Sequence, residues 1–246
     1  VYVWDMDETL VLLNSLLKSS YAEAFNGLKD VQKGVEIGRT WENLILQICD
    51  DYFFYEQIEN YNKPFLDALA QYDDGRDLSD YDFNQDELED DANNRKLAYR
   101  HRVIAQKYLQ GLRNILDHET IKLWDELYDK TDEYTDRWLS SARTFLKEHV
   151  NVLVTSGSIV PSLVKCMLFH LDSLIVYSSW EVGKIQCFRW IKERFPNVRF
   201  CAIGDGWEEC EAAEIMRWPF VKIDPRPHRF PGLTLTTVSH YFSVVY

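Results

Sequence analysis

The sequence has few of the features that mark secreted, membrane-spanning or zinc-binding proteins. Its 246 residues include only five cysteines, and no two of them form a CxxC pair. An odd number of scattered cysteines argues against a disulfide framework or a zinc site and favours a reducing compartment. No apolar run approaches the roughly 18 residues of a membrane span, and no basic segment precedes an apolar one as in a secretion signal. We therefore expect an intracellular protein, cytoplasmic and/or nuclear, without a membrane partner.

Positive charge is also scarce. The sequence holds 27 lysines and arginines against 40 aspartates and glutamates, which gives a net charge of −13. Such a balance argues against nonspecific binding to nucleic acid, so we expect no direct nucleic-acid partner. Hydrophobic residues make up 46% of the chain and aromatic residues 14%, enough for a substantial core. The length permits one domain with a large insertion or two smaller domains.

Short apolar runs that end in small or polar residues recur along the second half of the chain. After a first strand at residues 1–4, the sequence predicts strands at 152–154, 174–177, 198–203 and 219–223, with helices between them. Strands that alternate with helices indicate a parallel sheet. The predicted fold is α/β: a Rossmann-like three-layer α/β/α core with a parallel sheet, built from residues 1–11 and 150–246. A large helical cap, residues 12–149, is inserted after the first strand.

Within this insert, apolar residues recur at helical spacing in four stretches. The pattern predicts helices over 12–25, 97–115 and 121–145. It also predicts a helix that begins at Trp41, with Thr40 as its N-cap. We expect the insert to form a lobe above the carboxyl end of the first strand. Its aromatic run around residues 52–61 could stack on a substrate ring, but the lobe core is the favoured interpretation.

Two aspartates follow the first strand directly. The run Val1–Trp4 leads into Asp5, Met6 and Asp7, so an apolar strand ends abruptly in charge. In an open parallel sheet, ligands bind beyond the carboxyl ends of the strands. Two carboxylates so close together repel each other unless a cation such as Mg²⁺ lies near them. Taken alone, the pattern could also be an ordinary acidic turn.

Polar residues follow the other predicted strands, or lie on the helices entered from them. They are Thr155, Ser156, Lys184, Asp205, Glu208 and Glu209. Together with Asp5, Asp7 and Thr9 they supply what phosphoryl transfer requires. One carboxylate can attack phosphorus, and a second can exchange a proton with the leaving oxygen and with water. Hydroxyl groups and a lysine can hold phosphate oxygens, and Mg²⁺ held by carboxylates can neutralise the developing charge.

These motifs resemble those of the haloacid dehalogenase-like superfamily of phosphatases. Within it, the sequence resembles the Eyes absent family along essentially its whole length. The matching stretches are Trp4-Asp5-Met6-Asp7-Glu8-Thr9, Ser15-Leu16-Leu17, Ser20-Tyr21-Ala22, Asp77-Leu78-Ser79, Arg95-Lys96-Leu97-Ala98, Gly183-Lys184-Ile185-Gln186-Cys187-Phe188 and Gly204-Asp205-Gly206-Trp207-Glu208-Glu209. The matches in the insert, Asp77-Leu78-Ser79 above all, distinguish this family from its relatives.

The resemblance implies a role for each site residue. Asp5 would be the nucleophile and a Mg²⁺ ligand. Asp7 would be the general acid/base and give its backbone carbonyl to the same single ion, and Asp205 would complete the protein's ligands. The residues implied to bind phosphate are Thr155, Ser156, Lys184 and Thr9, and Thr9 could instead support the residues around it. Glu208 and Glu209 would lie around the metal, where Glu209 either orients a metal-bound water or caps the following helix.

The reaction implied by the family is hydrolysis of protein phosphotyrosine through an aspartyl-phosphate. Cysteine-based tyrosine phosphatases place an arginine six residues after the nucleophile, and none of the five cysteines has one there. The alternatives are a small-molecule phosphomonoester phosphatase, a mutase, and an interaction module that binds a transcription factor through the helical lobe. A dehalogenase is excluded because that chemistry needs no acid at Asp7. The sequence resembles the plant branch of the family, which lacks the N-terminal transactivation region of animal members.

Overall fold

A parallel sheet forms the centre of the molecule. The computed structural model describes residues 1–147, 149–223 and 243–244. Over these residues the strands are β1 (Tyr2–Trp4), β2 (Asn151–Thr155), β3 (Ile175–Ser178), β4 (Cys201–Gly204) and β5 (Phe220–Lys222). They pair in the order β3-β2-β1-β4-β5, all parallel, so the predicted strands are confirmed and β5 lies at the edge. Most of the predicted core segment after residue 223 lies outside the described residues.

The central strand, β1, marks the point where the order of the strands reverses. Val3 lies opposite Val152 of β2 on one side and Ala202 of β4 on the other. From β1 the chain builds the sheet outward in both directions, first through β2 and β3 and then through β4 and β5. At such a switch point the connections diverge, and a crevice opens beyond the carboxyl end of the strand. Asp5, the residue after β1, therefore lies where a ligand is expected.

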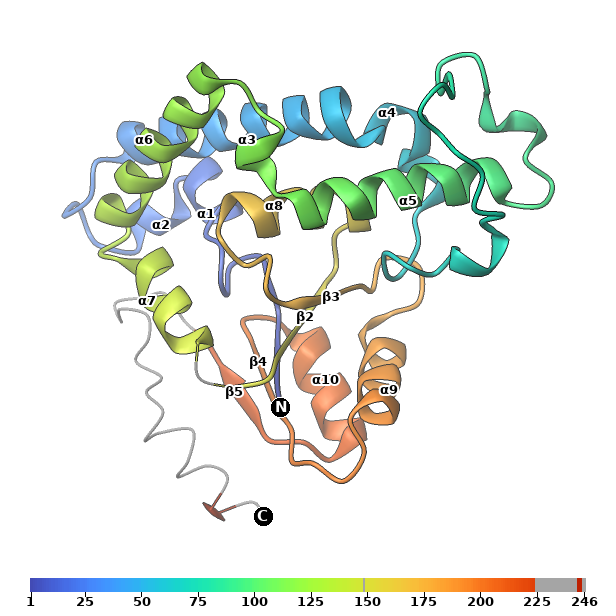
Figure 1. Cartoon of the computed structure of the whole chain (residues 1–246). Helices are drawn as coiled ribbons and strands as arrows, with labels where there is room; N and C mark the ends of the chain where they lie inside the picture. The colour runs from blue at the N-terminus through green and yellow to red at the C-terminus, as the bar shows by residue number, and fades with distance from the viewer. Residues whose placement is uncertain (148, 224–242, 245–246) are drawn as a thin grey trace.

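Helices cover both faces of the sheet, which confirms the predicted three layers (Figure 1). On one face Val3, Val152 and Ala202 pack against α9 (Lys184–Arg194) and α10 (Trp207–Met216). On the other face lie Trp4 and Leu153, in one apolar core with α8 (Ile159–Leu168) and α7 (Trp138–Leu146). Successive residues of a strand point to opposite faces, so each strand serves both layers.

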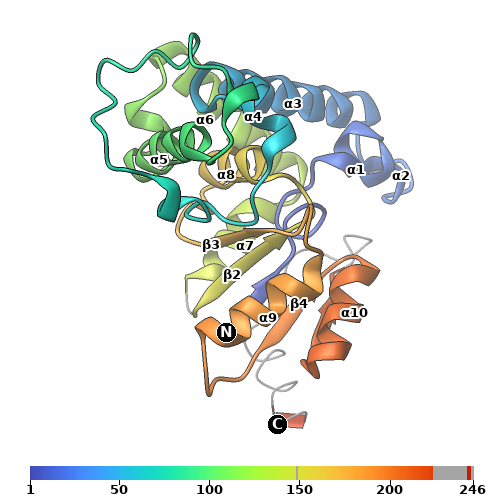
Figure 2. The same cartoon turned by 90° about the vertical axis from the view of Figure 1, so that its right-hand side faces the viewer.

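The longer helices of the insert form a lobe that packs onto α8. Helices α3 (Val31–Phe53), α5 (Arg95–Gln110) and α6 (His118–Tyr134) lie on the side of the sheet opposite α9 and α10 (Figures 1 and 2). The ring centroids of Trp41 and Phe169 are 4.4 Å apart. The indole nitrogen of Trp124 donates to the Leu168 carbonyl at 2.8 Å. Buried residues of the lobe are continuous with the apolar layer between α8 and the sheet. The division into two domains at residues 11/12 and 149/150 stays a prediction.

Two predicted helices of the insert are each broken into two. Residues 12–25 form α1 (Asn14–Leu17) and α2 (Ser20–Glu23), because Ser19 between them has a positive φ of 61°. Residues 121–145 divide between α6 and α7, because Asp136 and Arg137 have positive φ values. The remaining short elements are α4 (Tyr55–Ile58) and the 3₁₀ turns Glu59–Tyr61, Ala70–Tyr72, Leu88–Asp90 and Leu112–Asn114. Left-handed residues other than glycine leave no clear trace in a sequence.

The predicted start of the second helix at Trp41 is wrong. Helix α3 begins ten residues earlier, where the Asp30 side chain accepts a hydrogen bond from the Lys33 N–H at 3.1 Å. Gly38 lies inside this helix rather than ahead of it. A Cβ atom at Gly38 would lie 2.9 Å from the backbone nitrogen of Leu17, so the glycine allows α1 to approach closely. In the described part of the chain, no helix has both the length and the apolarity of a membrane span.

Candidate active site

A tight loop shapes the chain directly after β1. The Asp5 N–H donates to the Ile203 carbonyl of β4 at 2.9 Å, which fixes the aspartate at the carboxyl end of the parallel strands. The Met6 carbonyl then accepts hydrogen bonds from the N–H groups of Thr9, Leu10 and Val11, and Glu8 has a φ of 62°. In the adjoining part of the lobe, the Trp138 indole donates to the Thr9 carbonyl at 3.2 Å. The loop that carries Asp5, Asp7 and Thr9 is therefore held from two sides.

Lys184 joins a carboxylate at the end of β1 to one on the first turn of α10. It is the first residue of α9, and its ammonium lies 2.6 Å from Asp5 Oδ1 and also contacts Glu209 Oε1. All three side chains are almost fully buried. A buried ion pair is stable only when its charges are closely matched and hydrogen-bonded. Here one ammonium faces two carboxylates, so the cluster carries an excess of negative charge.

Burial and the neighbouring charges change the pKa values of these groups. Burial raises the pKa of Asp5 to about 7, although the Lys184 ammonium opposes the change. Burial and the Glu209 carboxylate also raise the pKa of Asp205. For Lys184, burial alone would lower the pKa, but Asp5 and Glu209 outweigh burial and raise it. A further positive charge would relieve the carboxylates, because opposite charge favours their ionised form.

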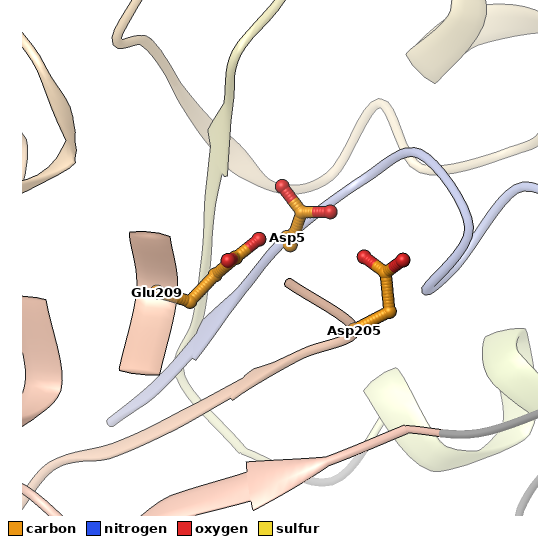
Figure 3. Close-up of side chains that lie close together, drawn as sticks. All are labelled: Asp5, Asp205 and Glu209. Atoms are coloured by element: carbon orange, nitrogen blue, oxygen red, sulfur yellow. The ribbon is translucent and has the colours of Figure 1, made fainter. Parts of the chain in front are cut away.

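Three carboxylates point toward one another at this position and can hold that charge. Asp5 follows β1, Asp205 follows β4, and Glu209 lies on the first turn of α10 (Figure 3). One oxygen from each lies within 4.8 Å of the others. Oxygens bound to one Mg²⁺ are at most about 4.2 Å apart, at Mg–O distances of about 2.1 Å, so a small contraction suffices. Among the described residues, Glu209 Oε2 is a buried oxygen without a hydrogen-bond partner. The cluster therefore fits a hard divalent cation.

Glu209 takes part in this cluster and does not cap its own helix. One of its carboxylate oxygens contacts Lys184, and within the described chain the other has no hydrogen-bond partner. Two glycines make room for it: a Cβ atom at Gly204 would lie 2.7 Å from Glu209 Cγ, and one at Gly206 would lie 2.7 Å from Oε2. The glycines of the Gly-Asp-Gly motif thus permit close packing of the carboxylate. Its role toward a metal-bound water stays a prediction.

The predicted phosphate-binding residues also lie near the carboxyl ends of the strands. The buried Thr9 hydroxyl is 3.5 Å from Asp5 Oδ2, a contact that can orient the aspartate. Thr155 is buried at the end of β2, and its hydroxyl accepts a hydrogen bond from the Gly157 N–H at 3.1 Å. Ser156 is exposed, and its hydroxyl lies 3.4 Å from a carboxylate oxygen of the exposed Glu208. The roles of these residues toward phosphate stay predictions.

Asp7 is separate from the three-carboxylate cluster and has a partner of its own. Its half-exposed carboxylate pairs with Lys165 at 2.7 Å. Lys165 lies on α8, in a segment whose other residues are mostly buried and apolar. Lys165 is not among the predicted site residues, because it lies in the last turn of α8 and not near the strand that precedes this helix. A lysine between Val164 and Cys166, inside an otherwise apolar helix, was the available signal.

Two tryptophans beside the site were also missed. Trp180 follows the end of β3 and Trp207 begins α10, and both are exposed. The aromatic run of the insert mostly packs into the lobe, as expected: Phe53 is fully buried, and Tyr52, Phe54 and Tyr55 pack against the core. Tyr61 at the end of that run is 41% exposed. Tryptophans directly next to Ser179 and the Gly-Asp-Gly motif were the signal for a surface of aromatic side chains at the site.

Fold and site together define a class of protein. Aspartates after the central parallel strand, a hydroxyl after the next strand, a lysine on a following helix and acidic residues after β4 are the arrangement of the haloacid dehalogenase-like α/β fold. Comparisons with known proteins narrow this class. No family model matches the sequence. Protein phosphatase EYA of Arabidopsis thaliana is 60% identical, over 100% of this chain and 90% of that protein.

Animal relatives match a smaller part of their own length. Protein phosphatase EYA2 of Homo sapiens is 31% identical over 91% of this chain and 47% of that protein. Protein phosphatase eya of Drosophila melanogaster is 30% identical over 91% of this chain and 33% of that protein. The chain belongs to the Eyes absent family of protein phosphatases. It spans nine tenths of the plant relative and less than half of these two animal relatives.

Proposed function

We propose that the chain is a Mg²⁺-dependent phosphatase that hydrolyses protein phosphotyrosine through an aspartyl-phosphate. One observation carries the proposal: Asp5 is a buried carboxylate in contact with Lys184, at the switch point of the sheet, next to two further carboxylates. The names of the relatives support a protein phosphatase. The choice of tyrosine, of an aspartate nucleophile and of Mg²⁺ is our proposal.

In the first step, an oxygen of Asp5 attacks phosphorus and the bond from phosphorus to the tyrosyl oxygen breaks. Asp7 gives a proton to that oxygen, so tyrosine leaves as the neutral phenol. The contact with Thr9 orients the Asp5 carboxylate, and the Lys184 ammonium holds a phosphate oxygen as negative charge develops. Asp5, Asp205 and the backbone of Asp7 would hold Mg²⁺, with the Glu209 carboxylate beside it, and the ion would supply positive charge against the phosphate oxygens.

In the second step, water attacks phosphorus while Asp7 takes a proton from it. The bond between phosphorus and the Asp5 oxygen breaks, which releases phosphate and restores both carboxyl groups. Lys165 fixes the position of Asp7 through the 2.7 Å contact from α8. Asp5 is buried whereas Asp7 is half-exposed, so the two aspartates have the different surroundings that their different roles require.

A panel of phosphorylated substrates tests the proposed substrate class. We expect the wild-type chain to hydrolyse phosphotyrosine peptides with a kcat/KM at least about tenfold above that for phosphoserine peptides of equal sequence and for sugar phosphates. Phosphate release, measured beside the Asp5→Asn variant, checks this. A higher kcat/KM for the sugar phosphates would instead establish a small-molecule phosphatase with the same machinery.

The leaving group tests the role of Asp7. We expect Asp7→Asn to lower kcat/KM for phenyl phosphate by roughly 10²- to 10³-fold, because phenolate leaves poorly unless it is protonated. The loss for 4-nitrophenyl phosphate should be at least about tenfold smaller, since nitrophenolate scarcely needs a proton. Asparagine keeps the backbone carbonyl that is proposed to bind Mg²⁺, so the variant changes only the side chain that is proposed to transfer the proton. Equal losses for the two substrates would refute the role as acid.

A further inference from the structure

A pocket of about 440 Å³ has Lys184 among its lining residues. It is formed by the ends of β2 and β3, the first residues of α9 and the first turns of α10. Its volume lies in the range of small-molecule sites, about 300–1,000 Å³. Lys184 also contacts Asp5, so the pocket and the predicted nucleophile share this residue. We call this space the tryptophan pocket, after Trp180 and Trp207 in its wall.

The two indoles are unusually exposed for side chains of their size. Trp180 is 67% and Trp207 is 71% exposed, although tryptophan is highly buried on average. Exposed apolar surface that gathers in one place marks an interaction site. The loop before Trp180 is fixed, because the Ser179 N–H and hydroxyl both donate to the Thr155 carbonyl, at 2.8 and 3.0 Å. Trp207 lies two residues after Asp205. Each tryptophan therefore lies in a segment that also contains, or is hydrogen-bonded to, a predicted site residue.

Charge in the pocket is distributed unevenly. Among the described residues that line it, Lys184 is the basic one and is buried against Asp5 and Glu209, whereas Glu208 and Glu211 stand exposed on α10. Glu181, between Trp180 and the start of α9, is exposed as well. The exposed outer part of the pocket therefore favours positive charge, and the phosphate belongs on the side of Lys184 and Asp5. A ligand that fits this distribution has a phosphate on the side of Lys184, a flat apolar group against the indoles, and positive charge near the glutamates.

From these features we propose that the tryptophan pocket binds the aromatic ring of an aryl phosphomonoester, carried as phosphotyrosine on a peptide with basic neighbours. This inference rests on the proposed phosphatase function and specifies its substrate. The rings of Trp180 and Trp207 contact the phenyl ring in offset-stacked or edge-to-face arrangements. The side chains of Glu208 and Glu211 attract lysine or arginine residues that flank the phosphotyrosine.

Paired substrates with and without a ring test this assignment. We expect Trp180→Ala and Trp207→Ala each to lower kcat/KM for a phosphotyrosine peptide by about three- to tenfold, mainly through KM, because ring contacts are lost. Hydrolysis of acetyl phosphate, which has no ring, should change by less than about twofold. The phenylalanine variants at both positions should keep most of the activity. Ile215→Ala, an exposed change on the same helix as Trp207, serves as the control.

The outcomes separate this inference from the proposed function. If the tryptophan variants change both substrates equally, or neither, the pocket does not bind the ring. If wild type turns over no substrate, or Asp5→Asn stays active, the proposed function itself fails. Binding of the phosphotyrosine peptide to the Asp5→Asn variant, measured by calorimetry, gives a second test that needs no turnover. There too, replacement of either tryptophan by alanine should weaken binding, and unchanged affinity would overturn the inference.

The acidic rim is tested with peptides of different charge. We expect peptides with lysine or arginine next to phosphotyrosine to have a higher kcat/KM than peptides with aspartate or glutamate there, and the difference should shrink with added salt. Glu211→Gln should reduce this preference and leave acetyl phosphate hydrolysis unchanged. A preference for acidic peptides, or one that Glu211→Gln does not change, would contradict the role of the rim.

Discussion

Asp5→Asn is expected to lower kcat by roughly 10⁴-fold or more, with every substrate that the wild type hydrolyses. An amide oxygen is a far weaker nucleophile than a carboxylate, and the change also removes one carboxylate from the cluster that could hold a metal ion. Steady-state phosphate release measures the effect, and Glu214→Gln, on an exposed part of α10, is the matched carboxylate control. Activity near the wild-type level would rule out Asp5 as the nucleophile.

This loss should occur without unfolding. In the metal-free protein, burial raises the pKa of Asp5 to about 7, from an ordinary value near 3.8. The pKa of Asp5 is higher in the folded protein than in the unfolded protein. The free energy of unfolding therefore falls as the pH rises from about 4 to 7, because the unfolded chain loses the Asp5 proton more easily. Asparagine avoids this loss, so the variant should unfold at least about 2 °C above wild type at pH 8 without metal. Near pH 4 the difference should vanish, which a thermal melt at both pH values can measure.

Chelation is expected to have a comparably large effect on activity. EDTA should abolish turnover and added Mg²⁺ should restore it, because Asp5, Asp205 and Glu209 place an excess of negative charge against the incoming phosphate. Mg²⁺ should also raise the unfolding temperature of the wild type, and raise it less for Asp205→Asn. Activity that persists in EDTA would contradict metal dependence.

The requirement for Mg²⁺ should itself depend on pH. A proton on Asp5 competes with the metal, and its pKa in the metal-free protein is about 7. The Mg²⁺ concentration for half-maximal activity should therefore rise as the pH is lowered from 8 to 6. Titrations of EDTA-treated protein with Mg²⁺ at several pH values measure this. A constant half-maximal concentration would show that Asp5 does not exchange a proton for the metal in this range.

Much of the sheet and part of the site could be predicted from the sequence. Buried parallel strands are continuous apolar runs, and β1 and β2 both end abruptly in polar residues. Because such strands share one carboxyl edge, Asp5 could be placed near Lys184, 179 positions away. Lys165 could not be found by this rule, since its contact with Asp7 depends on how α8 packs on the sheet. Exposure of Trp180 and Trp207 could not be predicted either, because tryptophan usually lies inside.

Helix boundaries in the insert depend on features that a single sequence does not display. Breaks at Ser19 and Arg137 arise from left-handed backbone at residues other than glycine, and Gly38 stays helical because α1 approaches it. The identity of the metal, the phosphotyrosine substrate, a transcription-factor partner and the cellular compartment stay predictions. Each depends on a molecule other than the chain itself.

The continuous core between the lobe and α8 has a consequence for how substrates reach the site. A cap that opens and shuts needs an interface that parts at low cost, but here parting would expose Trp41, Trp124 and Phe169. Each large buried side chain costs about 1.5–3 kcal/mol to expose, so an open form would be rare. We therefore expect that the opening and closing of a cap does not limit association. The change of shape that docking requires would then fall to the substrate, so the proposed function predicts phosphotyrosines in extended tails and loops.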